Sequence, residues 1–420
     1  MKTIPPVLSR IALACAIINI AAIPAVADES PKFVLKYGIV SGLTGDSSAA
    51  GQAWNEAARL AINYTADTLK RMNLNDISVV LADSQDSQGS PQTGVEVAQK
   101  LVKVDGVNVI IGDTFSSVTS AIASSVAIPN KVAIFTGGTS PALTKLNTIQ
   151  PGYLWQAITA DDVQGKVLAQ IAGESFGPTA KITIAARNDA YGTNLSAVFK
   201  DAWTAKGGTI LKTVIYNPQQ PLLDSEAREI VAGNPDGWLV IDFCQTFAKL
   251  ALPLIRSGQW DASKTFGSDT LNDCQSKGTR NYPGMRAVQA NASSGASFPA
   301  FKALYAEKAR PGVAFASFTA EAFDSVFVAF LAALQARSAD PSKFVAEVEK
   351  ITNDPGDNYT FEHLDDAIKA VLAGRKIHFN GATGPIAYTP IGRAGASAYD
   401  VWQVQADGSS KVIATVPLKP

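Results

Sequence analysis

Histidine and cysteine are scarce in this chain, with two histidines and three cysteines among 420 residues. That supply is too small for most metal sites built from these residues, so no metal site is expected. An excess of one charge is also missing, because 36 lysines and arginines stand against 37 aspartates and glutamates. Without a basic excess the chain has little with which to neutralise a phosphate backbone, which argues against nucleic acid as a partner.

Motifs of several enzyme classes are missing too. Gly42, Gly45 and Gly51 do not have the spacing of a dinucleotide-binding loop, and no Gly-Lys-Ser/Thr phosphate loop occurs. There is no Gly-x-Ser-x-Gly nucleophile elbow. We therefore expect no cofactor and no enzyme. Hydrophobic residues make up 46% of the chain and charged residues 17%, a composition that predicts a globular protein rather than a disordered one.

The first 27 residues have the pattern of a secretory signal peptide. Lys2 and Arg10 supply positive charge, residues 11–23 are apolar apart from Asn19, and small residues precede a cleavage point after Ala27. A membrane anchor would need about 20 apolar residues, which this run does not reach. A lipoprotein site at Cys15 is a further alternative, but the apolar stretch before it is short. We expect cleavage after Ala27 and export to the periplasm.

Cysteine usage agrees with export. Cys15 leaves with the leader, so Cys244 and Cys274 remain as an even pair in an oxidising compartment, which predicts one disulfide. Each follows an apolar run, and two neighbouring parallel strands would bring both sulfurs to the same sheet edge. Two buried free thiols are the alternative.

Short apolar runs alternate with segments of helical period through the first 290 residues, a pattern that predicts an α/β fold with parallel sheets covered on both faces. Ser90 and Pro91 form a typical helix start between two of these runs. The expected strands are 33–40, 77–81, 107–111, 132–135, 153–158, 182–186, 210–216 and 238–243.

The alternation breaks after about residue 290. Helical segments then follow one another at 298–310, 319–337, 342–351 and 364–373, and two strand-like runs at 398–404 and 411–416 close the chain. We expect a distributed topology in which late helices return to an early sheet.

Two loops at predicted strand ends carry groups suited to a small polar ligand, because ligands of open parallel sheets bind beyond the carboxyl ends of the strands. Residues 112–117 end in Ser116 and Ser117 at a predicted helix start, where hydroxyls and free N–H groups suit a carboxylate. Ordinary helix capping by either serine is the alternative. In the second loop, residues 136–141, Thr136 precedes two glycines that allow close backbone approach, and Thr139 offers a hydroxyl. A plain strand–helix turn is the alternative there.

Taken in order, several short motifs resemble one family, the type I periplasmic solute-binding proteins of branched-chain amino acid and amide ABC importers. The resemblance covers nearly all of the chain after the leader. The motifs are Tyr37 to Gly45 with Gly51, Val109 to Gly112 with Ser116 and Ser117, Gly137 to Pro141, Asn188 to Gly192, Ala320 to Asp324, and Phe379 to Pro385.

The resemblance implies two Rossmann-like α/β lobes joined by three crossovers, near residues 156–160, 288–293 and 384–395. Lobe 1 would hold residues 28–157 and 291–384. Lobe 2 would hold residues 158–290 and, after the hinge return, the last strands within 385–420.

The resemblance also implies a ligand site in the cleft between the lobes. Ser116, Gly138 and Thr139 match positions that hold a ligand carboxylate, Tyr191 matches one that packs over the ligand, and Asp269 matches an acidic residue that pairs with the α-ammonium. A helix cap is the alternative for Asp269. Phe115 and Thr114 depart from the family pattern and would reshape the side-chain pocket, to which Trp54 would add an aromatic wall. Asp242, Phe243 and Gln245 stand where family members place ligand-facing residues.

By resemblance the protein is expected to be a monomeric periplasmic component of an ABC importer that closes on an amino-acid-like ligand and delivers it to the permease. One rival is the same fold binding an aromatic or aliphatic carboxylate, an amide or urea. A second is a sensory role. A third is a secreted enzyme with Asp113, Asp242 or Asp269 as its base.

Overall fold

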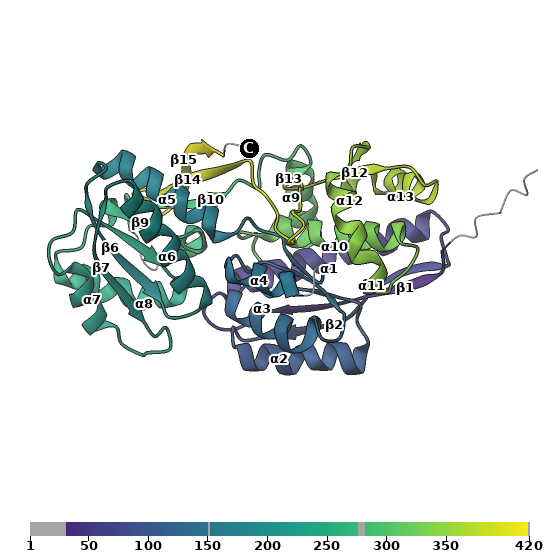
Figure 1. Ribbon diagram of the computed structural model, residues 1–420, viewed down its shortest axis with the longest axis horizontal. Helices are drawn as coiled ribbons and strands as arrows, with labels where there is room; N and C mark the ends of the chain where they lie inside the picture. The colour runs from purple at the N-terminus through teal and green to yellow at the C-terminus, as the bar shows by residue number, and fades with distance from the viewer. Residues whose placement is uncertain (1–30, 150–151, 276–281, 419–420) are drawn as a thin grey trace, which may run out of the picture. The chain divides into compact units, whose positions relative to one another are not determined.

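The structure, a computed structural model, describes residues 31–149, 152–275 and 282–418. The predicted signal peptide lies outside the described residues. Two large sheets organise the described chain, with strand orders β2-β1-β3-β4-β5 and β15-β14-β10-β9-β8-β6-β7. They form the cores of the two lobes, here lobe 1 and lobe 2, so the predicted α/β fold with two lobes is confirmed (Figure 1).

The sheet of lobe 1 is parallel throughout, and its short inner strands are fully buried because helices cover both faces. Helices α1 (Ser48–Arg71) and α10 (Thr319–Gln335) pack on one face, and α2 (Pro91–Lys100) and α3 (Ser116–Ile122) on the other (Figure 1). The Ser90 hydroxyl caps α2 as predicted, accepting from Thr93 N at 3.3 Å. The strands are β1 (Phe33–Ser41), β2 (Ile77–Asp86), β3 (Val109–Ile111), β4 (Ala133–Thr136) and β5 (Leu154–Gln156), and α4 (Ala142–Ile149) follows β4.

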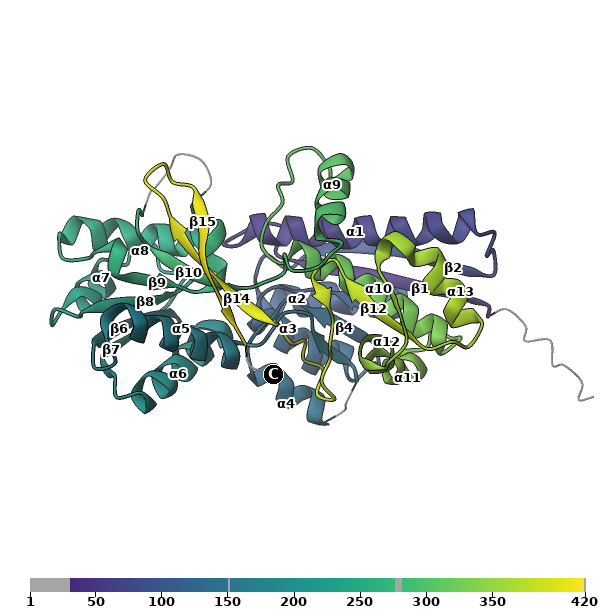
Figure 2. The ribbon, with the colours of Figure 1, turned by 90° about the horizontal axis from the view of Figure 1, so that it is seen from above.

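The sheet of lobe 2 is parallel in its centre and ends in an antiparallel hairpin. Strands β6 (Lys181–Arg187), β7 (Thr209–Tyr216), β8 (Gly237–Ile241), β9 (Thr265–Gly267) and β10 (Arg286–Ala290) pair in parallel. The hairpin of β14 (Ala398–Val404) and β15 (Ser410–Pro417) then adds to β10, so the chain's last strands lie beside strands from its middle (Figure 2). The helices are α5 (Asp161–Phe176), α6 (Ala190–Ala205), α7 (Asp224–Val231) and α8 (Cys244–Ser257).

The late helices return to lobe 1, where α10 lies against α1. Helix α10 is buried all round, which explains its almost continuous apolar sequence. The helix expected at 342–351 is interrupted, since a 3-10 turn at 345–347 separates α11 (Pro341–Phe344) from α12 (Val348–Asn353). The other late helices are α9 (Phe298–Lys308) and α13 (Leu364–Leu372). Sequence reasoning missed a small sheet of β11 (Asp357–Tyr359), β12 (Ile377–Gly381) and β13 (Gly384–Pro385).

Three segments join structure around the first sheet to structure around the second: residues 157–160, 291–297 and 386–397. Each of them falls within or beside one of the expected crossovers. The lobe boundaries themselves stay predictions.

Candidate functional site

The loops at the carboxyl ends of the parallel strands line a cavity between the lobes. Its volume is about 290 Å³. Asp46, Thr114 and Phe318 contribute to its wall from lobe 1, and Phe243 and Thr270 from lobe 2. Carboxyl ends of parallel strands are where open α/β sheets bind ligands, so this cleft is the candidate binding site.

The two predicted loops of lobe 1 contact each other, and of their residues Thr114 lines this cavity. Ser116 begins α3 and is buried, and its Oγ accepts a hydrogen bond from Ser140 N at 3.1 Å. Gly138 lies so close to it that a Cβ on Gly138 would stand 3.2 Å from Ser116 Cα, which explains the glycine there. Thr139 is buried beside them. Ser116, Gly138 and Thr139 therefore lie together in one buried cluster.

The other two hydroxyl residues of these loops have different surroundings. The Thr136 hydroxyl donates to Asp113 O at 2.6 Å and accepts from Gly138 N at 2.9 Å, so it holds the loop in shape. Ser117 is half-buried on the next position of α3.

Tyr191 and Asp269 meet inside lobe 2. Tyr191 lies in the first turn of α6, where Asp189 caps the helix by accepting from Tyr191 N and Gly192 N. Its hydroxyl donates to Asp269 Oδ1 at 2.6 Å. Asp269 begins a 3-10 turn (Asp269–Gln275) after β9, and the same oxygen accepts from Thr270 N, so it acts as a turn cap as well. Burial, followed by the negative charge of Asp269, raises the pKa of Tyr191 well above 10, which keeps its proton in place.

Aromatic rings connect this pair to lobe 1. The Phe243 ring stacks on Tyr191 with centroids 5.5 Å apart and an interplanar angle of 7°. The centroids of the Phe243 ring and the Phe115 ring of lobe 1 lie 4.7 Å apart in an edge-to-face arrangement. Phe115 and Phe243 are both buried, so aromatic contacts cross the cleft next to the acidic pair.

Two more carboxylates are buried near Asp269. Asp161, the first residue of α5, is fully buried, and its N–H donates to Thr139 O at 2.9 Å. Burial and then the charge of Asp269 raise the pKa of Asp161 well above its usual value. The Thr139 side chain, as a hydrogen-bond donor, and the positive charge of Arg393 act in the opposite direction. Within the described part of the chain, neither Asp161 carboxylate oxygen accepts a hydrogen bond of normal geometry.

Glu321, on α10, is the other buried carboxylate. Burial, with additions from Asp324 and Asp269, raises the pKa of Glu321 to about 8. Its Oε2 has no hydrogen-bond partner among the residues described. Because buried carboxylates without partners are costly, a cation near Asp161 and Asp269 would be favourable.

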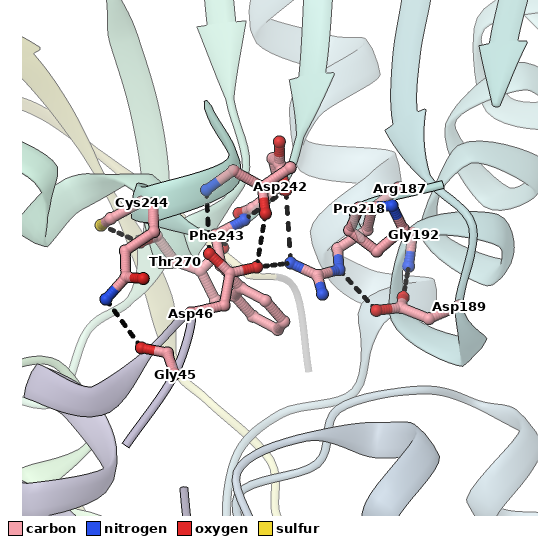
Figure 3. Close-up of polar contacts among 12 residues, drawn as sticks. Gly45, Asp46, Arg187, Asp189, Gly192, Pro218, Asp242, Phe243, Cys244 and Thr270 are labelled. Carbon is pink, nitrogen blue, oxygen red and sulfur yellow. Dashed lines mark hydrogen bonds and ion pairs between the residues drawn. The ribbon is translucent and has the colours of Figure 1, made fainter. Parts of the chain in front are cut away.

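A second polar cluster joins the lobes at the cleft mouth (Figure 3). The Asp46 carboxylate, in the loop before α1, accepts from Arg187 Nη1 at 2.8 Å and from Thr246 N at 2.9 Å. Nearby, Gln245 Nε2 donates to Gly45 O at 2.7 Å. Gln245, a predicted pocket residue, lines the cavity, is exposed and makes a contact between lobes.

The predicted disulfide between Cys244 and Cys274 is formed, with Cα atoms 5.0 Å apart. Cys244 is the first residue of α8 and Cys274 belongs to the turn that begins at Asp269. Both sulfur-bearing residues line the cleft cavity. The disulfide therefore ties the start of α8 to the turn that carries Asp269.

Trp54 is completely buried in α1, and its ring lies against Gly137. It supports the second loop from behind. Sequence reasoning did not select Phe318, which lines the cavity from the start of α10 with φ of 67°. Positive φ is a genuine outlier for so bulky a residue, which marks the position as one fixed by its surroundings.

Asp46, Asp161, Arg187 and Glu321 were also not selected. Arg187 is the last residue of β6 and so stands at the carboxyl end of a strand, which is the position that led to Ser116 and Thr139. Inspection of every strand end would therefore have identified Arg187 as well. Glu321 was detectable as an acidic residue near the start of a long apolar helix.

Over the described ranges, no helix combines the length and apolarity needed to cross a membrane. The same residues hold no group of three or more His, Cys, Asp or Glu side chains arranged to bind a metal ion.

Comparison with known proteins matches residues 34–409 to the family described as periplasmic binding protein. The fold is similar to the leucine-binding protein LivK of Thermotoga maritima, with a TM-score of 0.72, 20% identity, and coverage of 91% of this chain and 99% of that one. It is also similar to a solute-binding protein of an R. palustris ABC transporter in complex with 4-hydroxybenzoate, with a TM-score of 0.71, 16% identity, and coverage of 92% and 98%.

A third relative is the chemotactic signal transduction substrate-binding protein BasB of Halobacterium salinarum, 22% identical over 311 residues, or 73% of this chain and 72% of that protein. The family match spans most of the described chain and agrees with its two lobes and the cleft between them. The chain belongs to the periplasmic binding protein family.

Proposed function

We propose that this protein is the ligand-binding component of an ABC importer and that its ligand is amino-acid-like, with both a carboxylate and an ammonium group. The chain would be exported after cleavage at Ala27, bind its ligand as a monomer in the periplasm and deliver it to a permease. No bond is made or broken in this role. Family membership supports the general role, and the chemistry of the cleft supports the ligand class.

The observation that carries the ligand class is the buried acidic pair, Asp161 with Asp269. Asp161 is fully buried without a normal hydrogen bond to either oxygen, and Asp269 raises its pKa. An ammonium group placed between them would satisfy Asp161 and neutralise the repulsion, and Tyr191 would hold Asp269 in position. A charge-assisted contact of this kind contributes about 1.5–3 kcal/mol.

The carboxylate of the ligand would lie against Ser116 and Thr139. Thr139 adjoins both parts of the site, because its carbonyl oxygen accepts from Asp161 N at 2.9 Å. An α-amino acid carries its two charged groups on the same carbon, so a cradle for a carboxylate next to an acidic pair matches that arrangement.

The main rival ligand is a carboxylate without an amine, such as the 4-hydroxybenzoate bound by the R. palustris protein. Such a ligand would bring a negative charge toward Asp161 and Asp269 without compensating them, which disfavours it. A neutral amide or urea would leave the same pair uncompensated. The similarity to BasB favours, as a second candidate function, a sensory role for the ligand-bound protein.

Proton linkage distinguishes these ligand classes. Thermal unfolding against L-amino acids, their deaminated acids, aromatic acids, amides and urea first identifies a ligand. Calorimetry in buffers of different ionisation enthalpy then counts protons. An ammonium lowers the pKa of Asp161, so binding at a pH where the free protein holds Asp161 protonated should release a proton and tighten as pH rises.

A carboxylate without an amine would instead raise the pKa of Asp161 and release no proton from it, and this result would refute the proposed ligand class. The Asp161→Asn variant is the control, because it keeps the side-chain shape but has no titrating group. In it the proton release should vanish, and amino-acid affinity should fall by about tenfold.

A further inference from the structure

The loop between β1 and α1 reaches across the cleft to the start of α8. Asp46 in this loop accepts hydrogen bonds from Thr246 N at 2.9 Å and from Thr246 Oγ1 at 2.7 Å. Thr246 is the third residue of α8, which begins at Cys244. Lobe 1 thus places a carboxylate on the first turn of a helix that belongs to lobe 2.

Helix α8 has no cap of its own. Its N-cap residue is Phe243, which has no side-chain acceptor, and the first turn contains no acidic residue. The first four N–H groups of an α-helix lack intrahelical partners, and an Asp oxygen usually bonds to the third of them when it acts as cap. Asp46 makes that bond, but from the other lobe.

The same carboxylate pairs with Arg187, whose side chain is only 4% exposed. Arg187 also contacts two carboxylates of its own lobe, with Nε on Asp189 and Nη1 at 3.3 Å from Asp242, and its guanidinium lies 3.9 Å from the centroid of the Phe243 ring. Figure 3 shows Asp46 and Asp189 on opposite sides of this guanidinium.

We infer that Asp46 is a positioning residue for closure, a latch that holds the lobes together by capping α8 and pairing with Arg187 across the cleft. When the lobes separate, the first turn of α8 loses its cap, and Arg187 keeps only Asp189 and Asp242. The latch stands outside the proposed ammonium and carboxylate contacts, so it stabilises the closed form whichever ligand fills the cleft, and also in ligand-free protein.

Hydrogen exchange at Thr246 tests this directly, because its amide is protected by Asp46 alone among the contacts of the described chain. The full mature protein is stripped of ligand by unfolding and refolding with its disulfide intact. The Thr246 amide should then exchange at least about threefold faster in Asp46→Ala than in the unsubstituted protein. Small-angle scattering should show a larger radius of gyration for the variant.

Two variants and one internal standard make the result decisive. Asp189→Asn removes a charge from the same arginine within lobe 2 and keeps a good cap for α6, so Thr246 exchange should stay as in the unsubstituted protein. Asp46→Asn keeps an acceptor oxygen but loses the ion pair, so its Thr246 exchange rate should lie between those of Asp46→Ala and the unsubstituted protein. Amides of Leu250 and Leu254 report whether α8 itself is intact.

Equal Thr246 exchange in Asp46→Ala and the unsubstituted protein, with α8 intact, would overturn the latch. So would acceleration of the same size in Asp189→Asn. No ligand enters the experiment, so its outcome is independent of whether the proposed ligand class is right.

Discussion

The Tyr191 hydroxyl and the Asp269 carboxylate form a 2.6 Å hydrogen bond in which both groups are buried, one at the start of a helix and the other after a strand of the same lobe. Burial keeps the tyrosine protonated, so the bond orients the carboxylate rather than sharing its charge. The Asp269 carboxylate is thereby oriented by a fixed donor.

Substitution of this pair should separate charge from orientation. Asp269→Asn removes the charge and should weaken binding of an amine-bearing ligand by more than about tenfold. Tyr191→Phe removes only the orienting bond and should weaken it about fivefold. Isothermal titration calorimetry measures both, with Asp86→Asn as control, because Asp86 ends β2 and its carboxylate bonds to Leu43 and Thr44 of the same lobe. Full affinity in Asp269→Asn would exclude an ammonium partner role.

Two threonines in one loop should respond differently to removal of their hydroxyls. Thr139→Val should weaken binding of carboxylate-bearing ligands and leave thermal stability nearly unchanged. Thr136→Val leaves the buried N–H of Gly138 without its partner and removes one of the hydrogen bonds to Asp113 O, and should lower the free energy of unfolding by about 1–3 kcal/mol. Denaturant unfolding and calorimetry on both variants measure the contrast, and a loss of affinity only in Thr136→Val would contradict the assigned roles.

Buried acids should make the folded protein less stable as pH rises from about 5 to 8. Burial raises the pKa of Asp113 and Asp324 to about 6, of Asp242 to about 7 and of Glu321 to about 8. In the unfolded chain these groups titrate near 4. Between those values the folded state binds more protons, so its extra stability is complete at low pH and is lost as pH rises through the raised pKa values.

The melting temperature should accordingly fall by several degrees over this range in scanning calorimetry. Asp242→Asn should flatten the part of the profile that ends near pH 7. Carboxyl groups with lowered pKa, such as Asp86, act only below about pH 5 and do not mask the trend. A melting temperature that rises steadily toward pH 8 would contradict the raised pKa values of these buried acids.

Regular patterns made most of the fold predictable, while short or polar elements escaped. The alternation of apolar runs and helical periods predicted the α/β fold with parallel sheets, and the family resemblance implied two lobes; both are confirmed. Strand β11 is three residues long and mostly exposed, and β10 has half-buried polar residues, so neither produces an apolar run. Their pairing partners are distant in sequence and supply the stability that local pattern does not reveal.

The candidate site follows the same division. Ser116, Thr139 and Asp269 were selected by strand ends or by family resemblance, and their ligand roles stay predictions. Asp46 and Asp161 stand in a loop and at a helix start, where aspartate is commonplace, so nothing local sets them apart. Their significance comes from contacts with residues more than 100 positions away or from burial that only the folded chain creates.

The disulfide links two parts of the cleft, the start of α8 and the turn that carries Asp269. It binds the first residue of α8, beside the inter-lobe contact of Asp46, to the turn that carries Asp269. This covalent bond, between residues 30 positions apart in the sequence, limits how far the two can move apart. Displacement of Asp269 by an arriving ligand would therefore be transmitted to the start of α8, so that occupancy of the cleft and engagement of the opposite lobe become coupled events.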